Sequence, residues 1–258
     1  MEADISVDYP QKPGVLRRAC LCVEAGEVLG LVGESGSGKS TLALAVLGLL
    51  GHTGARASGR VKLLGRDLMT CTERELRDMR GRLVSLVPQS PVAALNPALR
   101  IETQLREAWR AHSREPWANE RERVLRMLEG AGLQPAEPFL HRFPRQISVG
   151  QAQRVLLAMA LLHAPSLVIA DEPTSALDAI TQREVLDLMA SYAAARSMSM
   201  LFISHDLPTV AAICRRLAIL QGGEIVESGA VGQVLANPQH PYTRRLVSAV
   251  PKWGEPAI

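Results

Sequence analysis

The chain has 258 residues, of which 47% are hydrophobic, 21% are charged and only 3% are aromatic, and its formal net charge is +3. This length and composition are typical of a globular α/β protein, while the low charge and scarce aromatic residues argue against a nucleic-acid partner. No secretion leader opens the chain and no apolar run could span a bilayer, so a soluble chain without a transmembrane segment is expected.

The first part of the chain predicts strands around one apolar helix. Residues 4–9 and 15–27 alternate like two strands of a hairpin, with Pro10 and Pro13 in the loop between them. Residues 28–32 are continuously apolar, as a buried parallel strand should be, and an apolar helix is expected over residues 39–50. A second hairpin over residues 59–68 and a buried strand over residues 83–87 follow.

Helical periodicity with many charges dominates from about residue 90 to residue 162, which predicts a helical subdomain inserted into the α/β core. Strand character returns at residues 166–171, 199–205 and 217–229, separated by helices over residues 180–196 and 207–215. The tail beyond Gly232 is interrupted by prolines and predicts one short helix.

The four cysteines do not predict a metal site. Cys20 and Cys22 alternate along one strand, whereas Cys71 and Cys214 are distant, and no CxxC spacing occurs. Buried or reduced thiols are expected.

A glycine-rich loop, GESGSGKST at residues 33–41, lies between the first buried strand and the apolar helix. The N–H groups of such a loop bind phosphate oxygens, helped by the dipole of the helix that follows. Lys39 is expected to neutralise the β- and γ-phosphates and Ser40 to bind Mg²⁺. The sequence therefore predicts nucleotide binding.

Further polar residues follow three other strands, and the carboxyl ends of strands are where open α/β sheets bind ligands. Asp171 is expected to hold Mg²⁺ through a water, and Glu172 to act as the general base on the attacking water. Gln89 could reach the metal or that water, and His205 the γ-phosphate. A lone histidine after an apolar strand is more often structural, and two adjacent carboxylates are often only a helix cap, so the combination carries the prediction.

The stretch RQISVGQAQRV at residues 145–155 predicts a helix that begins after Ser148, a good N-cap. Gly150 is unexpected in a first helical turn. Exposed N–H groups at a helix start attract an anion, and a glycine there lets the anion approach the backbone.

These motifs, taken in order, resemble the ATPase subunit of an ABC transporter over essentially the whole chain. The resemblance implies an α/β fold with a RecA-like P-loop NTPase core, an antiparallel β-subdomain and an inserted helical subdomain. It predicts an ATPase domain over residues 1–232, with the core and β-subdomain at about 1–89 and 163–232, the helical subdomain at about 90–162, and a C-terminal extension over 233–258.

The resemblance also implies the functional residues. Glu172, His205 and Lys39 are expected to be catalytic, and Ser40, Gln89 and Asp171 to bind Mg²⁺. ATP is expected to contact Tyr9, which would stack on adenine, and the loop residues Gly33, Glu34, Ser35, Gly36, Ser37, Gly38, Lys39, Ser40 and Thr41.

Two such subunits stack head to tail in the family, so each ATP lies between the loop of one chain and the signature motif of the other. Here that motif would be Ser148, Val149, Gly150 and Gln151, with Asp178 in the dimer-interface loop. Val149 replaces the usual glycine and Ile147 the usual leucine, so whether Val149 weakens the site is open.

Two segments, SPVAALNPALRI after Gln89 and HPYTRRL near the end, resemble the oligopeptide, dipeptide and nickel importer branch. This implies a second and usually different ATPase subunit, two membrane permeases, and indirectly a solute-binding protein, at the cytoplasmic face of the inner membrane. The solute would be a peptide, nickel or a metal–chelator complex. No cysteine follows Cys214, so no iron–sulfur cluster is expected.

Two alternatives remain from other functional classes. A soluble ABC ATPase acting on ribosomes or DNA is disfavoured, because the chain has a single cassette and no sustained heptads. A catalytically impaired scaffold subunit is disfavoured by the presence of Lys39, Glu172 and His205, and favoured only by Val149.

Overall fold

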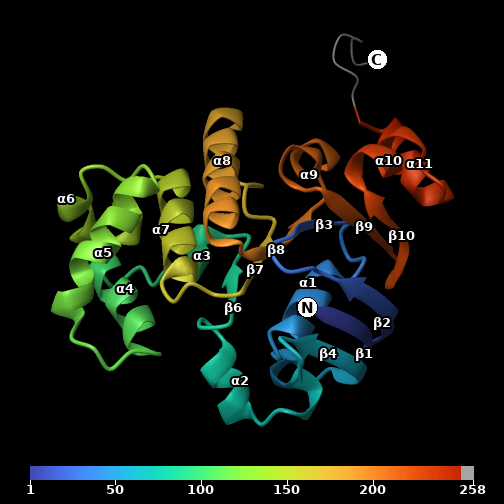
Figure 1. Cartoon of the computed structure of the whole chain (residues 1–258), viewed down its shortest axis with the longest axis horizontal. Coiled ribbons are helices and arrows are strands. Elements are labelled where there is room, and N and C mark those ends of the chain that lie inside the picture. Colours follow the sequence, from blue (N-terminus) through green and yellow to red (C-terminus); the bar gives the residue numbers. More distant parts are fainter. Residues whose placement is uncertain (251–258) are drawn as a thin grey trace. The chain divides into compact units, whose positions relative to one another are not determined.

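The computed structural model describes residues 1–250 (Figure 1). Positions 251–258, the end of the predicted C-terminal extension, lie outside the described residues. The chain forms two compact units. Unit 1 combines Met1–Thr72 with the chain from Ser199 onward, and unit 2 is Glu73–Met198. The domain boundaries expected from the sequence stay predictions.

Unit 1 contains an antiparallel sheet in the order β2-β1-β4-β5. Its strands are β1 (Glu2–Tyr9), β2 (Lys12–Cys22), β4 (Arg56–Leu63) and β5 (Arg66–Asp67). Both predicted hairpins are therefore present. Pro13, expected in a loop, lies within β2, and the sheet tolerates it because β2 is an edge strand.

Four more strands of unit 1 lie side by side in the order β10-β9-β3-β8. They are β3 (Val28–Val32), β8 (Ser199–Ser204), β9 (Arg216–Gln221) and β10 (Glu224–Ala230). The strand β3 runs parallel to both β8 and β9, while β10 is antiparallel to β9. Continuous apolar sequence in β3 is explained by burial, since Leu29 and Leu31 are fully inaccessible.

The helices of unit 1 differ from the prediction in two respects, the length of the helix after residue 38 and the number of helices in the tail. They are α1 (Lys39–Val46), η1 (Leu50–Thr53), η2 (Leu68–Thr70), α9 (Leu207–Ile213), α10 (Val231–Ala236) and α11 (Pro241–Ser248). Helix α1 ends before residue 50, because Gly48 adopts φ +65°. The tail forms two helices where one was expected. Pro238 follows the first, and Pro241 opens the second at its first turn.

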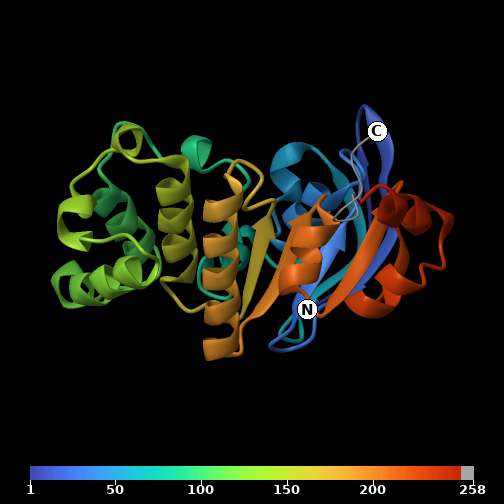
Figure 2. The same cartoon turned by 90° about the horizontal axis from the view of Figure 1, so that it is seen from above.

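Unit 2 combines two parallel strands with a group of helices. The strands β6 (Val84–Val87) and β7 (Leu167–Asp171) pair in register from Val84 to Val87. The helices are α2 (Glu73–Met79), α3 (Pro91–Ala94), α4 (Ile101–Arg110), α5 (Trp117–Gly130), α6 (Ala136–Leu140), η3 (Pro144–Gln146), α7 (Val149–Leu161) and α8 (Ala179–Arg196). Helices α4, α5, α6 and α7 gather together in Figure 1, and α7 and α8 run side by side in both views (Figure 2).

No helix within residues 1–250 is long and apolar enough to cross a bilayer. The cysteines are all free thiols, with Cys20 exposed, Cys22 and Cys71 half-buried, and Cys214 buried. Burial, with a smaller contribution from the charge of Glu27, raises the pKa of Cys214 to about 12.

The contact between β3 and α9 leaves no room for a side chain at Gly30. A Cβ there would lie 2.4 Å from Cγ1 of Val210 and 3.3 Å from Sγ of Cys214. We expect Gly30→Ala to lower the free energy of unfolding by about 1–3 kcal/mol, the usual cost of overpacking. Chemical denaturation measures this change. Gly51→Ala is the matched control, since within residues 1–250 no atom other than those of the adjacent residues lies within 4 Å of its added Cβ. Equal effects of the two substitutions would contradict the packing argument.

Candidate functional site

The phosphate loop (residues 33–41) begins where β3 ends and leads into α1. Its first residue, Gly33, lies against the backbone of β9. A Cβ at Gly33 would be 2.3 Å from the carbonyl oxygen of Leu220 and 2.7 Å from Oγ of Ser37. Only glycine fits there, because the neighbouring atom belongs to the backbone and cannot move aside.

Lys39 holds the loop together from inside. Its side chain is only 6% exposed, and Nζ donates to the carbonyl oxygens of Gly33 at 2.7 Å and Glu34 at 2.9 Å. The Ser37 N–H also donates to the Glu34 carbonyl at 3.2 Å. The Ser37 hydroxyl is buried without a hydrogen-bond partner among residues 1–250. A buried ammonium and an unpaired hydroxyl next to a helix start suit a phosphate group.

His205 comes to the same edge of unit 1 through strand register. Val32 of β3 pairs with Ser204 of the parallel strand β8, so the next residues, Gly33 and His205, leave adjacent strands at corresponding positions. His205 is exposed, and Asp206 after it caps α9 by accepting from the N–H of Thr209 at 3.1 Å. Residue 205 therefore follows β8 at the level at which the phosphate loop follows β3.

The turn between β1 and β2 brings Tyr9 and Lys12 together. These residues pair across the hairpin, and Tyr9 is half-buried. The Lys12 ammonium lies 3.9 Å from the position that a Cβ on Gly36 would occupy. Lys12 therefore adds a second cation next to the loop. Sequence reasoning missed it, because only the position of Tyr9 drew attention to this turn.

The carboxyl ends of β6 and β7 in unit 2 carry the next group of predicted residues. Val87 pairs with Ala170, so Gln89 and Glu172 lie two residues beyond a matched pair. The Gln89 side chain donates from Nε2 to Oε2 of Glu172 at 3.0 Å. Asp171 is the last residue of β7 and is half-buried. Strand register thus brings these three residues together.

The backbone of Glu172 is strained, because its φ of +45° lies in the left-handed region that non-glycine residues avoid. The Ser175 hydroxyl donates to the Glu172 carbonyl at 3.1 Å and stabilises the turn. Such conformations cost about 1–3 kcal/mol and cluster at functional sites. The positive φ of Glu172 changes the direction of the backbone immediately after β7 ends.

The signature segment (residues 147–151) begins α7 with a complete capping box. The Ser148 hydroxyl accepts from the N–H of Gln151 at 3.2 Å, and the Gln151 side chain accepts from the N–H of Ser148 at 3.0 Å. The predicted N-cap is confirmed. Because the hydroxyl oxygen acts as the acceptor, its proton remains available for donation to an anion.

Packing within unit 2 explains why residue 150 is a glycine. This glycine is buried, and a Cβ there would lie 2.5 Å from Cγ2 of Thr181 at the start of α8. Thr181 is itself fixed, because its N–H and hydroxyl both donate to Asp178, at 3.0 Å and 2.7 Å. Those two hydrogen bonds, in that order, hold the pKa of Asp178 below its usual range. Val149, by contrast, is 38% exposed.

A model of the family described as "ABC transporter" matches residues 16–175. The chain belongs to the ABC transporter family. It is 45% identical to the peptidoglycan transport ATP-binding protein YejF of Agrobacterium fabrum over 90% of its own length and 42% of that protein. It is 35% identical to the dipeptide transport ATP-binding protein DppD of Escherichia coli over 92% of its length and 73% of that protein.

The same fold occurs in a solved ABC cassette. A dimeric structure of a post-hydrolysis state of an ATP-binding cassette bound to ADP and Pi matches with a TM-score of 0.79 and 25% identity, covering 89% of this chain and 97% of that one. The mixed α/β ABC ATPase fold expected from the sequence is therefore confirmed. The chain spans less than half the length of the Agrobacterium relative.

Within this ABC cassette, the structure gathers the predicted residues in three places. The phosphate loop lies with Tyr9 and His205 in unit 1, Gln89 lies with Asp171 and Glu172 in unit 2, and the signature segment packs on the Asp178 turn in unit 2. A residue that sequence reasoning did not assign to the site also reaches the loop. Tyr242 of α11 accepts the Glu34 N–H at 2.9 Å.

A double substitution tests the packing of Gly150 against Thr181. We expect Gly150→Ala to lower the free energy of unfolding by about 1–3 kcal/mol through overpacking against Thr181. Adding Thr181→Ser removes Cγ2 but keeps the hydroxyl that binds Asp178, so most of the stability should return. Denaturation of the two variants and of Thr181→Ser alone measures this. Equal stability of Gly150→Ala with and without Thr181→Ser would contradict the contact.

Proposed function

We propose that the chain binds and hydrolyses Mg²⁺-ATP and thereby drives a membrane importer as its energy-coupling subunit. The observation that carries this proposal is the contact between Gln89 and Glu172 at the ends of two parallel strands. In the same cassette, Lys39 lies buried inside a loop suited to phosphate. Membership of the ABC family and the transport ATP-binding relatives support the coupling role.

In unit 1 the N–H groups of the phosphate loop hold the triphosphate. The loop residues that contribute them include Glu34, Ser35, Gly36, Gly38 and Thr41. Lys39 shifts from the carbonyls that it contacts onto the β- and γ-phosphates, which are stronger partners for an ammonium. The phosphates would give the buried Ser37 hydroxyl an acceptor, and the Ser40 hydroxyl would help to hold Mg²⁺. Tyr9 stacks on the base, and His205 contacts the γ-phosphate. Mg²⁺ supplies charge neutralisation of the phosphate oxygens.

In unit 2, Glu172 accepts a proton from the attacking water as the general base. Gln89 donates a hydrogen bond to the Glu172 carboxylate, and this bond holds the carboxylate in one orientation. The amide oxygen of Gln89 stays available to help hold Mg²⁺. Asp171 would help to hold Mg²⁺ at the end of β7. The turn with positive φ at Glu172 fixes the direction in which the base faces.

The signature segment acts on ATP held by a second cassette. The first N–H groups of α7 have no partner within the helix, and Ser148 still has a proton to donate. The side chain of Gln151 accepts the Ser148 N–H and thereby fixes the conformation of the segment. Val149 is exposed next to Ser148. Asp178 orders the neighbouring turn. A dimeric arrangement occurs in the matched cassette bound to ADP and Pi.

The partners that we propose are a second and different ATPase subunit and two permeases at the cytoplasmic face of the inner membrane, with a solute-binding protein acting indirectly. The segment after Gln89 would contact a permease, because hydrogen bonds fix its backbone in one conformation. Gln104 is 7% exposed and bonds to the backbone of Asn96 twice and of Leu99 once, while Val92 stays exposed. Relatives named for dipeptide and peptidoglycan transport favour a peptide solute over nickel or a metal–chelator complex.

Glu172→Gln tests the general base. We expect phosphate release from ATP to fall by about 100-fold or more, the usual range for such a base, while ATP binding persists. Phosphate-release kinetics and a binding titration on the same sample measure both quantities. Glu122→Gln is the control, since that carboxylate is exposed and pairs with Arg126 one turn along its own helix. Undiminished turnover in Glu172→Gln would remove Glu172 as the base.

A complementation experiment tests the action of Ser148 across two chains. When this chain carries Ser148→Ala and its partner ATPase subunit carries alanine at the lysine of its own phosphate loop, head-to-tail pairing leaves one intact site, and about half of the activity should remain. When this chain instead carries both Ser148→Ala and Lys39→Ala beside an unmodified partner, both sites are damaged and activity should be lost. ATPase assays of the two mixed dimers measure the difference, and the reverse ranking would contradict the sandwich.

Because Ser148 also caps α7, its replacement by alanine costs about 1 kcal/mol of stability. Ser148→Asp is therefore the matched variant. It keeps a capping acceptor but removes the donated proton. Full activity in a stable aspartate variant would contradict the role of Ser148 as a donor to phosphate, because the aspartate has no proton to donate.

A further inference from the structure

The C-terminal helix α11 contributes a side chain to the phosphate loop, although 208 residues separate the two partners. The phenol oxygen of Tyr242 accepts the Glu34 N–H at 2.9 Å, and Tyr242 is only 2% exposed. A buried hydroxyl that binds a loop N–H replaces water there, so the hydrogen bond is shielded from competition.

Glu34 is held on its other side by the residues that serve phosphate. Its carbonyl accepts from the Lys39 ammonium at 2.9 Å and from the Ser37 N–H at 3.2 Å. The backbone of Glu34 is thus fixed by Tyr242 through its N–H and by Lys39 and Ser37 through its carbonyl. A shift at Glu34 would disturb both of the residues expected to contact phosphate.

The start of α11 is pinned to β10 by one carboxylate. Glu227 accepts the N–H groups of Gln239 and His240, each at 2.9 Å, and Nδ1 of His240 accepts the N–H of Tyr242 at 3.2 Å. Partial burial acts to raise the pKa of Glu227, but the hydrogen bonds from the N–H groups of Gln239 and His240 act against it, and the pKa lies below its usual range. Glu227 is therefore ionised near neutral pH and fixes the turn that delivers Tyr242.

Tyr242 remains a neutral phenol near neutral pH. Burial raises its pKa, the Glu34 N–H acts in the opposite direction, and the Glu34 carboxylate raises it again through its charge and a hydrogen bond. The guanidinium of Arg245 lies 5.8 Å from the centre of the ring and on the same helix. A neutral phenol suits this place, because it can accept from the Glu34 N–H without adding a negative charge beside bound phosphates.

We propose that Tyr242 is a positioning residue for the phosphate loop, and that the C-terminal extension thereby preorganises this loop for the triphosphate. The inference rests on the proposed ATP-binding function and extends it to a residue outside the nucleotide-binding motifs. Tyr242 acts through Glu34 on the groups that contact phosphate. A preorganised loop loses less conformational freedom when it binds, so it binds more tightly.

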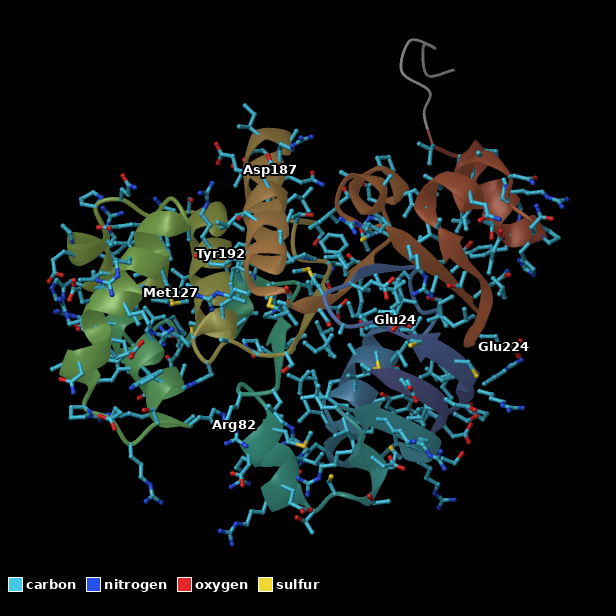
Figure 3. All side chains as sticks on the ribbon, viewed as in Figure 1. Glu24, Arg82, Met127, Asp187, Tyr192 and Glu224 are labelled. Atoms are coloured by element: carbon cyan, nitrogen blue, oxygen red, sulfur yellow. The ribbon has the colours of Figure 1, made fainter. Side chains whose placement is uncertain are left out.

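Tyr242→Phe tests this inference, because it removes only the hydroxyl and keeps the buried ring. We expect the Kd for Mg²⁺-bound, fluorescently labelled ATP to rise about fivefold in the full chain, equivalent to one ordinary hydrogen bond. The KM for ATP should rise with it, while kcat stays within about twofold because no transition-state contact is lost. Tyr192→Phe is the matched control. Tyr192 lies on α8 (Figure 3), and its hydroxyl faces Gly130 in unit 2.

The number of binding sites separates positioning from loss of fold. A variant that merely unfolds in part binds less nucleotide at an unchanged Kd, which would contradict the inference. Glu227→Gln supplies a second test that leaves Tyr242 in place. It should raise Kd less than Tyr242→Phe does, and should add nothing in the Tyr242→Phe background if Glu227 acts through Tyr242.

An unchanged Kd in fully folded Tyr242→Phe, or in Glu227→Gln should Tyr242→Phe fail to fold, would overturn the role of Tyr242. Failure of the unmodified chain to bind the labelled ATP would instead overturn the proposed ATP-binding function. The two failures are therefore distinguishable in one titration series.

Discussion

The parallel register of neighbouring strands is the constraint on which the functional groups of this cassette depend. Val32 is matched to Ser204 in unit 1 and Val87 to Ala170 in unit 2, so the residues that follow leave their strands at the same level. A one-residue slip in either pair would separate the partners and turn their side chains to the other face. The apolar sequence of these strands resists such a slip, because both faces are buried.

Gly150 and Ser148 in the signature segment each satisfy a requirement of the fold and a requirement of the proposed phosphate contact. Gly150 suits an anion at a helix start, yet the structure shows that Thr181 alone already excludes a side chain there. Ser148 suits phosphate through its proton, yet its oxygen already caps α7. Local packing and capping therefore keep the segment in shape without nucleotide, which is what preorganisation requires.

The sequence predicted most of the fold and led to the residues of the candidate site, because both rest on local patterns. Continuous apolar runs located β3 and β7, and strand ends located Gln89, Glu172 and His205. Contacts between distant segments were not predictable in the same way. Lys12 and Tyr242 lie in segments with no phosphate-binding pattern, and only folding brings them to Gly36 and Glu34. The tail was expected to hold one helix, because its short helices have too little periodicity to be told apart.

The contact between Tyr242 and Glu34 also gives helix α11 a physical reason to be part of the cassette. A loop that binds phosphate through N–H groups must stay open, so it cannot be stabilised by side chains on its binding side. Support has to come from behind, through groups such as the Glu34 N–H and the Gly33 carbonyl. Lys39 provides part of this support, but in the ATP-bound state that we propose it would change partners. Tyr242 has no such second task, so its hydrogen bond can hold the loop both before and after nucleotide enters.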